Sequence, residues 1–288
     1  MTGPRRPGVL RLIVNGDDYG LTPDISRAVL DAHEAGVLTT TSVVVTTPAF
    51  AEAAEALRQR PELGVGLHLA LVGGDEPAAA RDRIGTLLDR EGRLLPSWRA
   101  FLARASTGRI DHAQARLELE AQHERLRRAG LAPEHLDSHQ NEHLWPATAR
   151  LGVALAAERG IRSVRTPDSQ GRDPRGLGIR LLSGRLRRRL AAAGLHTTEA
   201  MVGLDGAERY ARRVADDVAL LRTRAEQGGG LVAELALHLS HPGDGALAAY
   251  DWGYDYAGAL AAVLEPGFAR VLSEPGVELV TWAQARDR

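Results

Sequence analysis

One segment of this chain gathers an unusual number of chemically active side chains. HLDSHQNEHLWP, residues 135–146, holds three histidines, two carboxylates and two amides within nine positions. These groups are unfavourable to bury unless each finds a partner, so the segment is either a solvated loop or a site. Asp17 and Asp18 end a short apolar run elsewhere, His68 lies within VGLHLAL, and His241 lies in HPGD. Acids and imidazoles therefore recur along the chain.

Metal-assisted hydrolysis is the chemistry that would use this set. The chain has no cysteine, so histidine and carboxylate would have to hold any metal. One carboxylate and two neutral imidazoles can bind a divalent ion and leave positions open for water, whose pKa the ion lowers. A second carboxylate is then free to act as base, and His241 could supply the acid. Asp137 could fix the tautomer of a histidine ligand as a hydrogen-bond acceptor.

Each of these residues also has a structural interpretation. Asp17 and Asp18 could begin a helix or form a turn, and His68 could be a buried core histidine. His238 and His241 are three positions apart, so in a strand they point to opposite sides. We take His238 as the structural one. If the strand continued through this segment, Asp137, His139, Asn141 and His143 would share one face.

The elements around these residues alternate between short β-branched runs and longer amphipathic ones. Strands are expected at 9–16, 40–47, 63–70, 133–139, 161–166, 231–239 and 276–282. Helices are expected at about 23–35, 48–59, 112–129, 146–159, 177–193, 206–227 and 254–273. Repeated strand–helix units predict a parallel sheet, in which the active residues gather at the carboxyl ends of the strands. The chain reads as one domain over residues 1–288, with an excursion at about 71–111.

Composition narrows the function class. The 36 basic and 37 acidic side chains nearly balance, which argues against a general nucleic-acid-binding protein. The apolar run near the start is too short for a signal peptide, and no stretch approaches the length of a membrane span, so we expect a cytoplasmic protein.

Residues 176–195 predict a helix with five arginines, which is either a barrel helix with a solvated basic face or a segment that touches an anionic membrane transiently.

With these residues assembled, the chain resembles the YdjC-like family of carbohydrate deacetylases. The likeness rests on five blocks in the family's order, namely NGDDYGLTPDISRAVLDAHEAGVLTTTSVVV, VGLHLAL, HLDSHQNEH followed by Pro146, VRTPD and ELALHLSHPGD. It implies an α/β fold, an irregular TIM-like barrel. It also implies an enzyme that uses one divalent metal ion to remove the acetyl group from N-acetylated amino sugars. The wording of LDSHQNEHLWP, GDDYGLTP and LTTTS is most similar to the HpnK branch linked to hopanoid biosynthesis, which suggests N-acetylglucosamine carried on a hopanoid lipid.

The resemblance also implies roles for individual residues. Asp17 would be the general base and His241 the general acid. The metal ligands would be Asp18, His68 and His139. Arg165 in VRTP and His143 would lie near the substrate. Asn141 stands where the family often has a further histidine, so this position has no expected role in metal binding.

Several alternatives stay open at this point. The ion could be Zn, Mg, Mn, Co, Ni or Fe, because histidine and carboxylate suit all of them. The substrate could be a glycolipid, a chito-oligosaccharide or an antibiotic precursor. A metal-dependent phosphodiesterase could use the same ligands, although the sequence shows no phosphate-binding loop. A sugar-binding module would need no acid and base pair. The sequence does not predict an oligomeric state.

Overall fold

The fold is built on one curled parallel sheet. The computed structural model describes residues 8–287 except 170, 172, 204–209 and 251–252. Its strands are β1 (Leu10–Tyr19), β2 (Thr40–Val43), β3 (Gly64–Leu69), β4 (His135–Ser138), β5 (Ser163–Val164), β6 (Ala200–Val202), β7 (Leu231–Leu237) and β8 (Val277–Leu279). Seven strands follow the order β5-β4-β3-β2-β1-β7-β6, and β8 pairs with β1. All pairings are parallel.

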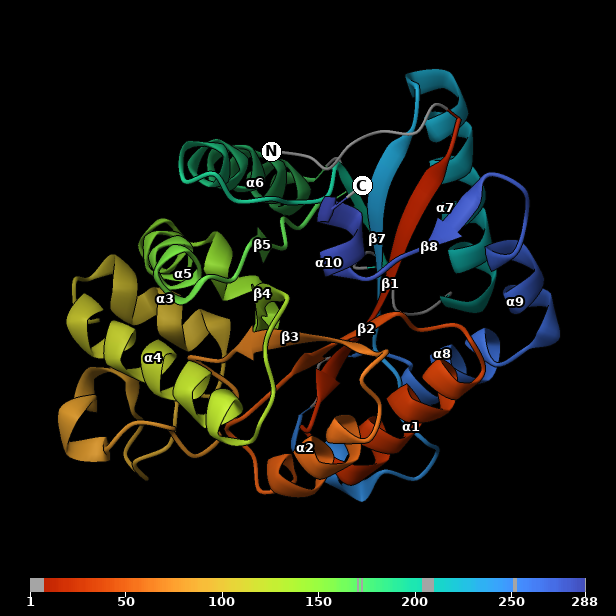
Figure 1. Ribbon diagram of the computed structural model, residues 1–288. Helices are drawn as coiled ribbons and strands as arrows, with labels where there is room; N and C mark the ends of the chain where they lie inside the picture. The colour runs from red at the N-terminus through yellow and green to blue at the C-terminus, as the bar shows by residue number, and fades with distance from the viewer. Residues whose placement is uncertain (1–7, 170, 172, 204–209, 251–252, 288) are drawn as a thin grey trace.

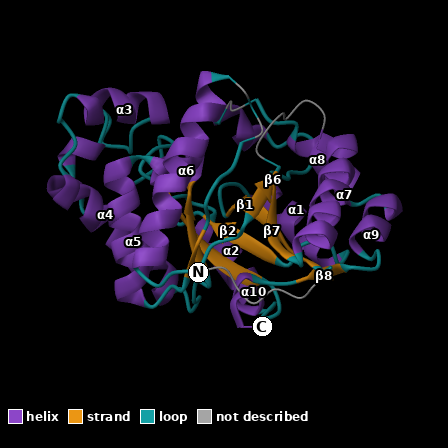
Figure 2. Cartoon of the chain, turned by 90° about the horizontal axis from the view of Figure 1, so that it is seen from above, coloured by secondary structure: helices purple, strands orange, loops and turns teal. Residues whose placement is uncertain are grey.

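Helices surround this sheet (Figures 1 and 2). They are α1 (Pro23–Glu34), α2 (Phe50–Arg58), α3 (Trp98–Ser106), α4 (His112–Arg128), α5 (Pro146–Arg159), α6 (Pro174–Ala192), α7 (Tyr210–Gly228), α8 (Tyr256–Val263), α9 (Pro266–Leu272) and α10 (Trp282–Asp287). Because helices cover the sheet, every residue of β1, β3 and β7 is buried, whereas the three residues of β8 are only partly buried.

The sheet closes only part of the way into a barrel. Its two edge strands, β5 and β6, do not pair with one another, and a single bridge between Ser163 and His196 connects the β5 edge to the segment before β6. This arrangement is an irregular TIM-like barrel of the α/β class, and the fold class expected from the sequence is confirmed. Among the described helices, none combines the length and the apolar character that a membrane span requires.

Most differences from the expected elements have local causes. Strand β6 has only three residues, too short to give an alternating pattern. The helix expected at 254–273 is two helices, because Pro266 lacks the N–H that would continue α8 and instead begins α9. The strand expected at 133–139 ends at Ser138, where the chain enters a 3₁₀ segment, His139–Leu144.

Residues 71–111 leave the sheet after β3 and return at α4. They form two short 3₁₀ turns and α3. Two buried side chains of α4 hold the start of this segment. Gln122 donates to the Ala70 carbonyl and accepts from the Ala70 N–H, while the Glu118 carboxylate accepts the N–H groups of Ala78 and Ala79 at 2.9 Å each. The segment is thus fixed to the barrel wall.

Candidate active site

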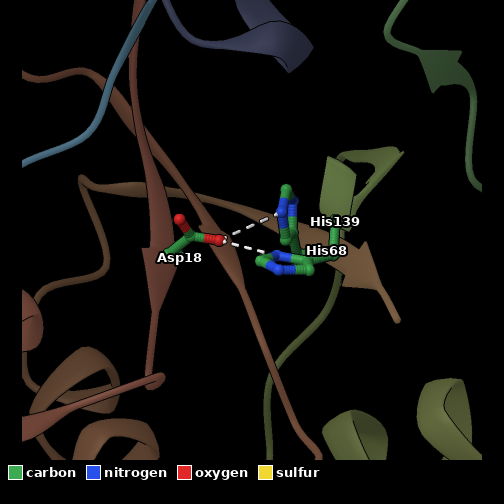
Figure 3. Close-up of side chains that lie close together, drawn as sticks. All are labelled: Asp18, His68 and His139. Carbon is green, nitrogen blue, oxygen red and sulfur yellow. Dashed lines mark hydrogen bonds and ion pairs between the residues drawn. The ribbon is translucent and has the colours of Figure 1, made fainter. Parts of the chain in front are cut away.

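Three buried side chains meet at the carboxyl end of the sheet. The Asp18 Oδ1 atom lies 3.0 Å from His139 Nδ1 and 3.3 Å from His68 Nε2 (Figure 3). One ligand atom from each residue can be chosen so that all lie within 4.8 Å of one another. Asp18 and His68 lie near the carboxyl ends of β1 and β3, and His139 directly follows β4. These strands lie in the order β4-β3-β2-β1 in the sheet. Parallel strands bring these ends to one edge, so residues up to 121 positions apart form one cluster.

The cluster fits a divalent cation. His68 Nδ1 lies 2.8 Å from Asp137 Oδ1, which fixes the imidazole so that Nε2 faces Asp18. A carboxylate behind a histidine in this way is typical of metal sites. Burial opposes protonation of His68, but Asp137 and Asp18 outweigh it and raise the pKa of the imidazole to about 10. The cluster therefore attracts positive charge, and two imidazoles with one carboxylate suit Zn²⁺ and its first-row neighbours.

An irregularity in β1 makes room for two adjacent acids. In a regular strand Asp17 and Asp18 would point to opposite faces. Here the pairing of β1 with β2 shifts register between Gly16 and Tyr19, and Asp18 has a φ of 63°, in the left-handed region. A bulge of this kind re-aims side chains and is frequent beside active sites. Both carboxylates consequently line the same cavity.

Asp17 is held from behind. Arg165 donates from Nη1 to Asp17 Oδ2 and from Nη2 to Oδ1, both at 2.8 Å. The Asn15 side-chain amide donates to Oδ1 at 2.6 Å. With both oxygens engaged, the carboxylate is held in one orientation at the edge of the cavity. This is the geometry of a positioned general base.

Arg165 is the centre of a buried charge network. Besides Asp17 it contacts Asp137 Oδ2 at 2.6 Å and Glu234 Oε1 at 2.6 Å. Burial opposes ionisation of Asp137, but Arg165 and His68 outweigh it and hold its pKa well below the usual range. Burial raises the pKa of Glu234 despite Arg165. Arg165 is 1% exposed and is not among the residues that line the cavity, so the structure places it behind Asp17, and its expected position near the substrate stays a prediction.

The positions of the two histidines after β7 are the reverse of those expected, which placed His241 at the site and made His238 structural. His238 lines the cavity, with Nε2 3.8 Å from Asp17 Oδ2 and 3.9 Å from Asp18 Oδ2. His241 is directed away, with its Nε2 2.8 Å from Asp31 on the exposed side of α1. The structure therefore does not bring His241 to the cluster. Burial lowers the pKa of His238, although Asp17 and Asp18 oppose the change.

His143 also lies outside the cavity. Its Nδ1 is 2.6 Å from Ser138 Oγ and its Nε2 is 3.1 Å from the Arg165 carbonyl, so both ring nitrogens are engaged. Gln140 and Asn141 have left-handed φ values of 50° and 57°, which turn the chain back after His139. The strand therefore ends before these positions can share one face, and the structure does not bring His143 to the cavity. Its expected position near the substrate stays a prediction.

The cavity above the cluster has a volume of about 670 Å³, within the range of about 300–1,000 Å³ typical of ligand sites. Its buried end holds Asp17, Asp18, His68, His139 and His238. The rest of the lining is Pro96, Ser97, Trp98, Arg99, Ser138, Gln140, Asn141, Arg175, Ala249 and Tyr254. The cavity thus has an acidic, histidine-rich floor and a mixed polar and aromatic mouth.

Sequence reasoning assigned no role to several of these residues. Glu234 reaches the network because it lies in β7 with the same parity as His238, a signal the strand pattern contained. Tyr254 stacks on His238 with ring centroids 4.1 Å apart and planes at 9°. Asn15 is visible only through its contacts with Asp17 and Ser42, because its polarity inside an apolar strand says nothing of its partners.

A protein family and several curated relatives match this chain. A family model described as YdjC-like protein matches residues 11–274. Relatives called carbohydrate deacetylase include one from Mus musculus, 32% identical over 81% of this chain and 79% of its own length. One from Homo sapiens is 30% identical over 97% and 91%. A relative from Citrobacter koseri called chitooligosaccharide deacetylase is 37% identical over 52% of this chain and 57% of its own.

A solved structure shares the fold. It comes from Enterococcus faecalis V583 and was assigned provisionally to cellobiose-phosphate cleavage. The two chains superpose with a TM-score of 0.75, covering 95% of this chain and 98% of the other, at 23% sequence identity. At that identity the likeness concerns the fold alone.

Proposed function

The chain belongs to the YdjC-like protein family, and from this premise we propose that it is a metal-dependent hydrolase that removes the acetyl group from an N-acetylated amino sugar. The names of the curated relatives support a carbohydrate deacetylase. The observation that carries the proposal is the buried cluster of Asp18, His68 and His139 beside a second, separately held carboxylate, Asp17.

Asp18, His68 and His139 would hold the divalent ion. When bound, the ion supplies Lewis acidity, which polarises the acetyl carbonyl and makes water more acidic. Asp137 keeps His68 in the tautomer that leaves Nε2 available to the site. The described residues form one cluster of this kind, which disfavours a two-ion phosphodiesterase as the alternative.

Asp17 is the residue we assign as general base. It lines the cavity next to Asp18, and Arg165 and Asn15 hold its carboxylate in one orientation. It takes a proton from the water molecule that attacks the acetyl carbon. Asp17 is only 3% exposed, and the positive charge of Arg165 lies against both of its oxygens. Positioned proton transfer of this kind contributes about 10²–10⁴-fold to rate.

His238 takes the role of general acid that the sequence had assigned to His241. Its Nε2 lies 3.8 Å from Asp17 Oδ2 and 3.9 Å from Asp18 Oδ2, and stacking on Tyr254 fixes its ring plane. Burial lowers the pKa of His238, whereas the neighbouring Asp17 and Asp18 oppose that change and so favour the protonated ring that this role requires. As the C–N bond breaks, that proton passes to the amine nitrogen, and the products are acetate and a free amino sugar.

The finer identity of the substrate stays a prediction from the sequence. N-acetylglucosamine on a hopanoid lipid, a chito-oligosaccharide and an antibiotic precursor all carry the N-acetyl group that this site would cleave. A cytoplasmic location and contact of α6 with an anionic membrane are likewise predictions. The ion is one of Zn, Mg, Mn, Co, Ni and Fe.

Acetate release tests the proposal directly. Purified protein is supplied with each candidate ion and incubated with N-acetylglucosamine on a hopanoid tail and, separately, with N,N′-diacetylchitobiose. Release from the lipid-linked sugar only would support the hopanoid substrate. Release from the disaccharide only would exclude the hopanoid substrate and keep the deacetylase. Asp17→Asn is the matched control, which should bind the ion and release no acetate. Failure of both substrates with ion bound would contradict the sugar classes proposed.

A further inference from the structure

An exposed tryptophan lies at the mouth of the cavity. Trp98 lines the cavity and is 41% exposed. Among the described residues every other tryptophan and phenylalanine is buried or partly buried. Large aromatic side chains normally gain stability by leaving water, so one that stays exposed inside a ligand site indicates a surface for a ligand.

The position of Trp98 is tied to the imidazole cluster. Trp98 is the first residue of α3, and Ser97 caps this helix by accepting the Ala100 N–H at 3.3 Å. The backbone N–H of Trp98, which has no partner within its own helix, donates to Gln140 Oε1 at 3.0 Å. Gln140 directly follows His139 and has the left-handed φ of 50° described above. A strained backbone of this kind persists where the surrounding structure requires it.

The Arg99 guanidinium also lies over one face of the indole. The Arg99 guanidinium carbon lies 5.1 Å from the Trp98 ring centroid, within the range of a cation–π contact. A ring restrained at its backbone and at one side loses less freedom when a ligand covers it. Trp98 is thus a preorganised platform.

The cavity therefore presents two aromatic surfaces at different depths. Tyr254 stacks on His238 next to the catalytic acids, whereas Trp98 lies at the exposed mouth. A pyranose ring has an apolar C–H face and polar hydroxyl edges, and the mouth offers the matching groups. The indole provides the apolar surface, and the side chains of Ser97 and Asn141, which line the same cavity, provide polar partners.

We propose that Trp98 forms an outer subsite that binds the pyranose ring adjacent to the acetylated sugar, so that the preferred substrate contains at least two sugar rings. This inference rests on the proposed function, because the acetylated ring must occupy the buried end beside Asp17 and Asp18. It assigns Trp98 a role in selecting the substrate, distinct from the residues that carry out the reaction.

The test compares kcat/KM for N,N′-diacetylchitobiose and N-acetylglucosamine in the parent protein, Trp98→Ala and Trp98→Phe. Trp98→Ala should lower the value for the disaccharide about tenfold, since one aromatic contact is lost, and change the monosaccharide less than twofold. Trp98→Phe should keep most of the preference. Leu177→Ala, which removes an exposed apolar side chain of α6 outside the cavity, is the matched control and should change neither value.

Three results distinguish this inference from the proposed function. Acetate release with an unchanged disaccharide preference in Trp98→Ala would overturn the subsite and leave the deacetylase standing. An equal loss on both sugars would also overturn it. If the parent releases no acetate from either sugar, calorimetric titration with the disaccharide decides. Weaker binding to Trp98→Ala would then support the subsite although the reaction is wrong, and equal binding would overturn both.

Discussion

Arg165 binds Asp17 with two parallel hydrogen bonds of 2.8 Å, one from each terminal nitrogen of its guanidinium. The same group binds Glu234 and Asp137. One buried cation thus faces three buried carboxylates, and the planar fork of the guanidinium determines how Asp17 faces the cavity. We therefore propose that Arg165 is a positioning residue, which acts through Asp17.

Replacing Arg165 separates positioning from charge. Arg165→Lys keeps a cation but cannot form two parallel bonds to one carboxylate, so we expect kcat to fall about 10²-fold with little change in KM or metal content. Arg165→Met leaves three carboxylates without compensation and should lower the free energy of unfolding by about 3–5 kcal/mol. Steady-state kinetics, metal analysis and urea denaturation measure these effects. Full activity in Arg165→Lys would show that Asp17 needs no clamp.

The two histidines after β7 can be told apart by parallel substitution. His238→Ala should lower kcat about 10²–10⁴-fold, because it removes the proton donor we assign to the leaving amine. His241→Ala should stay within about threefold of the parent, because it breaks only a surface contact with Asp31. Circular dichroism of each variant shows whether the fold is intact. The reverse ranking would return the acid role to His241.

Asp137 should govern metal affinity without touching the ion. Its carboxylate accepts from His68, Ser42 and Arg165, so Asp137→Asn would place an amide N–H group against a donor. We expect the affinity for the divalent ion to fall about 10–100-fold. Ser42→Ala, which keeps the carboxylate and loses one of its donors, is the milder control. Calorimetric titration of the metal-stripped proteins measures the affinity of each for the ion. An affinity of Asp137→Asn equal to that of the parent would show that Asp137 has no role in metal binding.

Glu142 predicts a pH dependence of stability. Its Oε2 accepts the Leu71 N–H at 2.8 Å, and burial raises the pKa of this carboxyl to about 8, from an ordinary value of 4.5. Between pH 4.5 and 8 the folded protein binds more protons at this group than the unfolded chain does. Its contribution is therefore complete below about pH 4.5 and is lost as pH rises towards 8.

Glu142→Gln tests this assignment. The amide keeps an oxygen for the Leu71 N–H but does not titrate, so stability relative to the parent should improve as pH rises, by up to about 1.4 kcal/mol per pH unit within that window. Denaturant midpoints at about pH 5 and about pH 8 give the comparison. A difference that stays the same at both pH values would show that Glu142 titrates normally.

The alternation of apolar and amphipathic runs was enough to predict an α/β fold with a parallel sheet, and the family resemblance added the irregular TIM-like barrel. Long strands such as β1 and β7 carry continuous buried residues, and their pattern is unambiguous. Strand β6 was missed because its three residues are held by pairing with β7, a contact made between distant parts of the chain. Short edge elements owe their conformation to neighbours more than to their own sequence.

The structure brings Asp18, His68 and His139 together at the carboxyl ends of neighbouring strands, as the topology requires. Strand parity could not show that Asp17 and Asp18 line one cavity, because the bulge in β1 re-aims them. Parity separates His238 from His241 correctly, but it does not say which one faces inward. The bonds of Glu234 to Arg165 determine that side, and His238 shares it. Strand parity could not predict the position of His143, because Gln140 and Asn141 have left-handed φ values and the chain is no longer extended there.

The open edge of the barrel has a consequence for the order in which the site is assembled during synthesis. Strand β5 has two residues, and Arg165 follows it directly. Asp18, His68 and His139 are all present once the chain has emerged as far as His139. The clamp on Asp17 comes from a residue 148 positions after it, and Glu234 comes later still. A nascent chain therefore contains the three proposed metal ligands before it contains Arg165, and Glu234 and His238 join this cluster only with β7, the last long strand of the sheet.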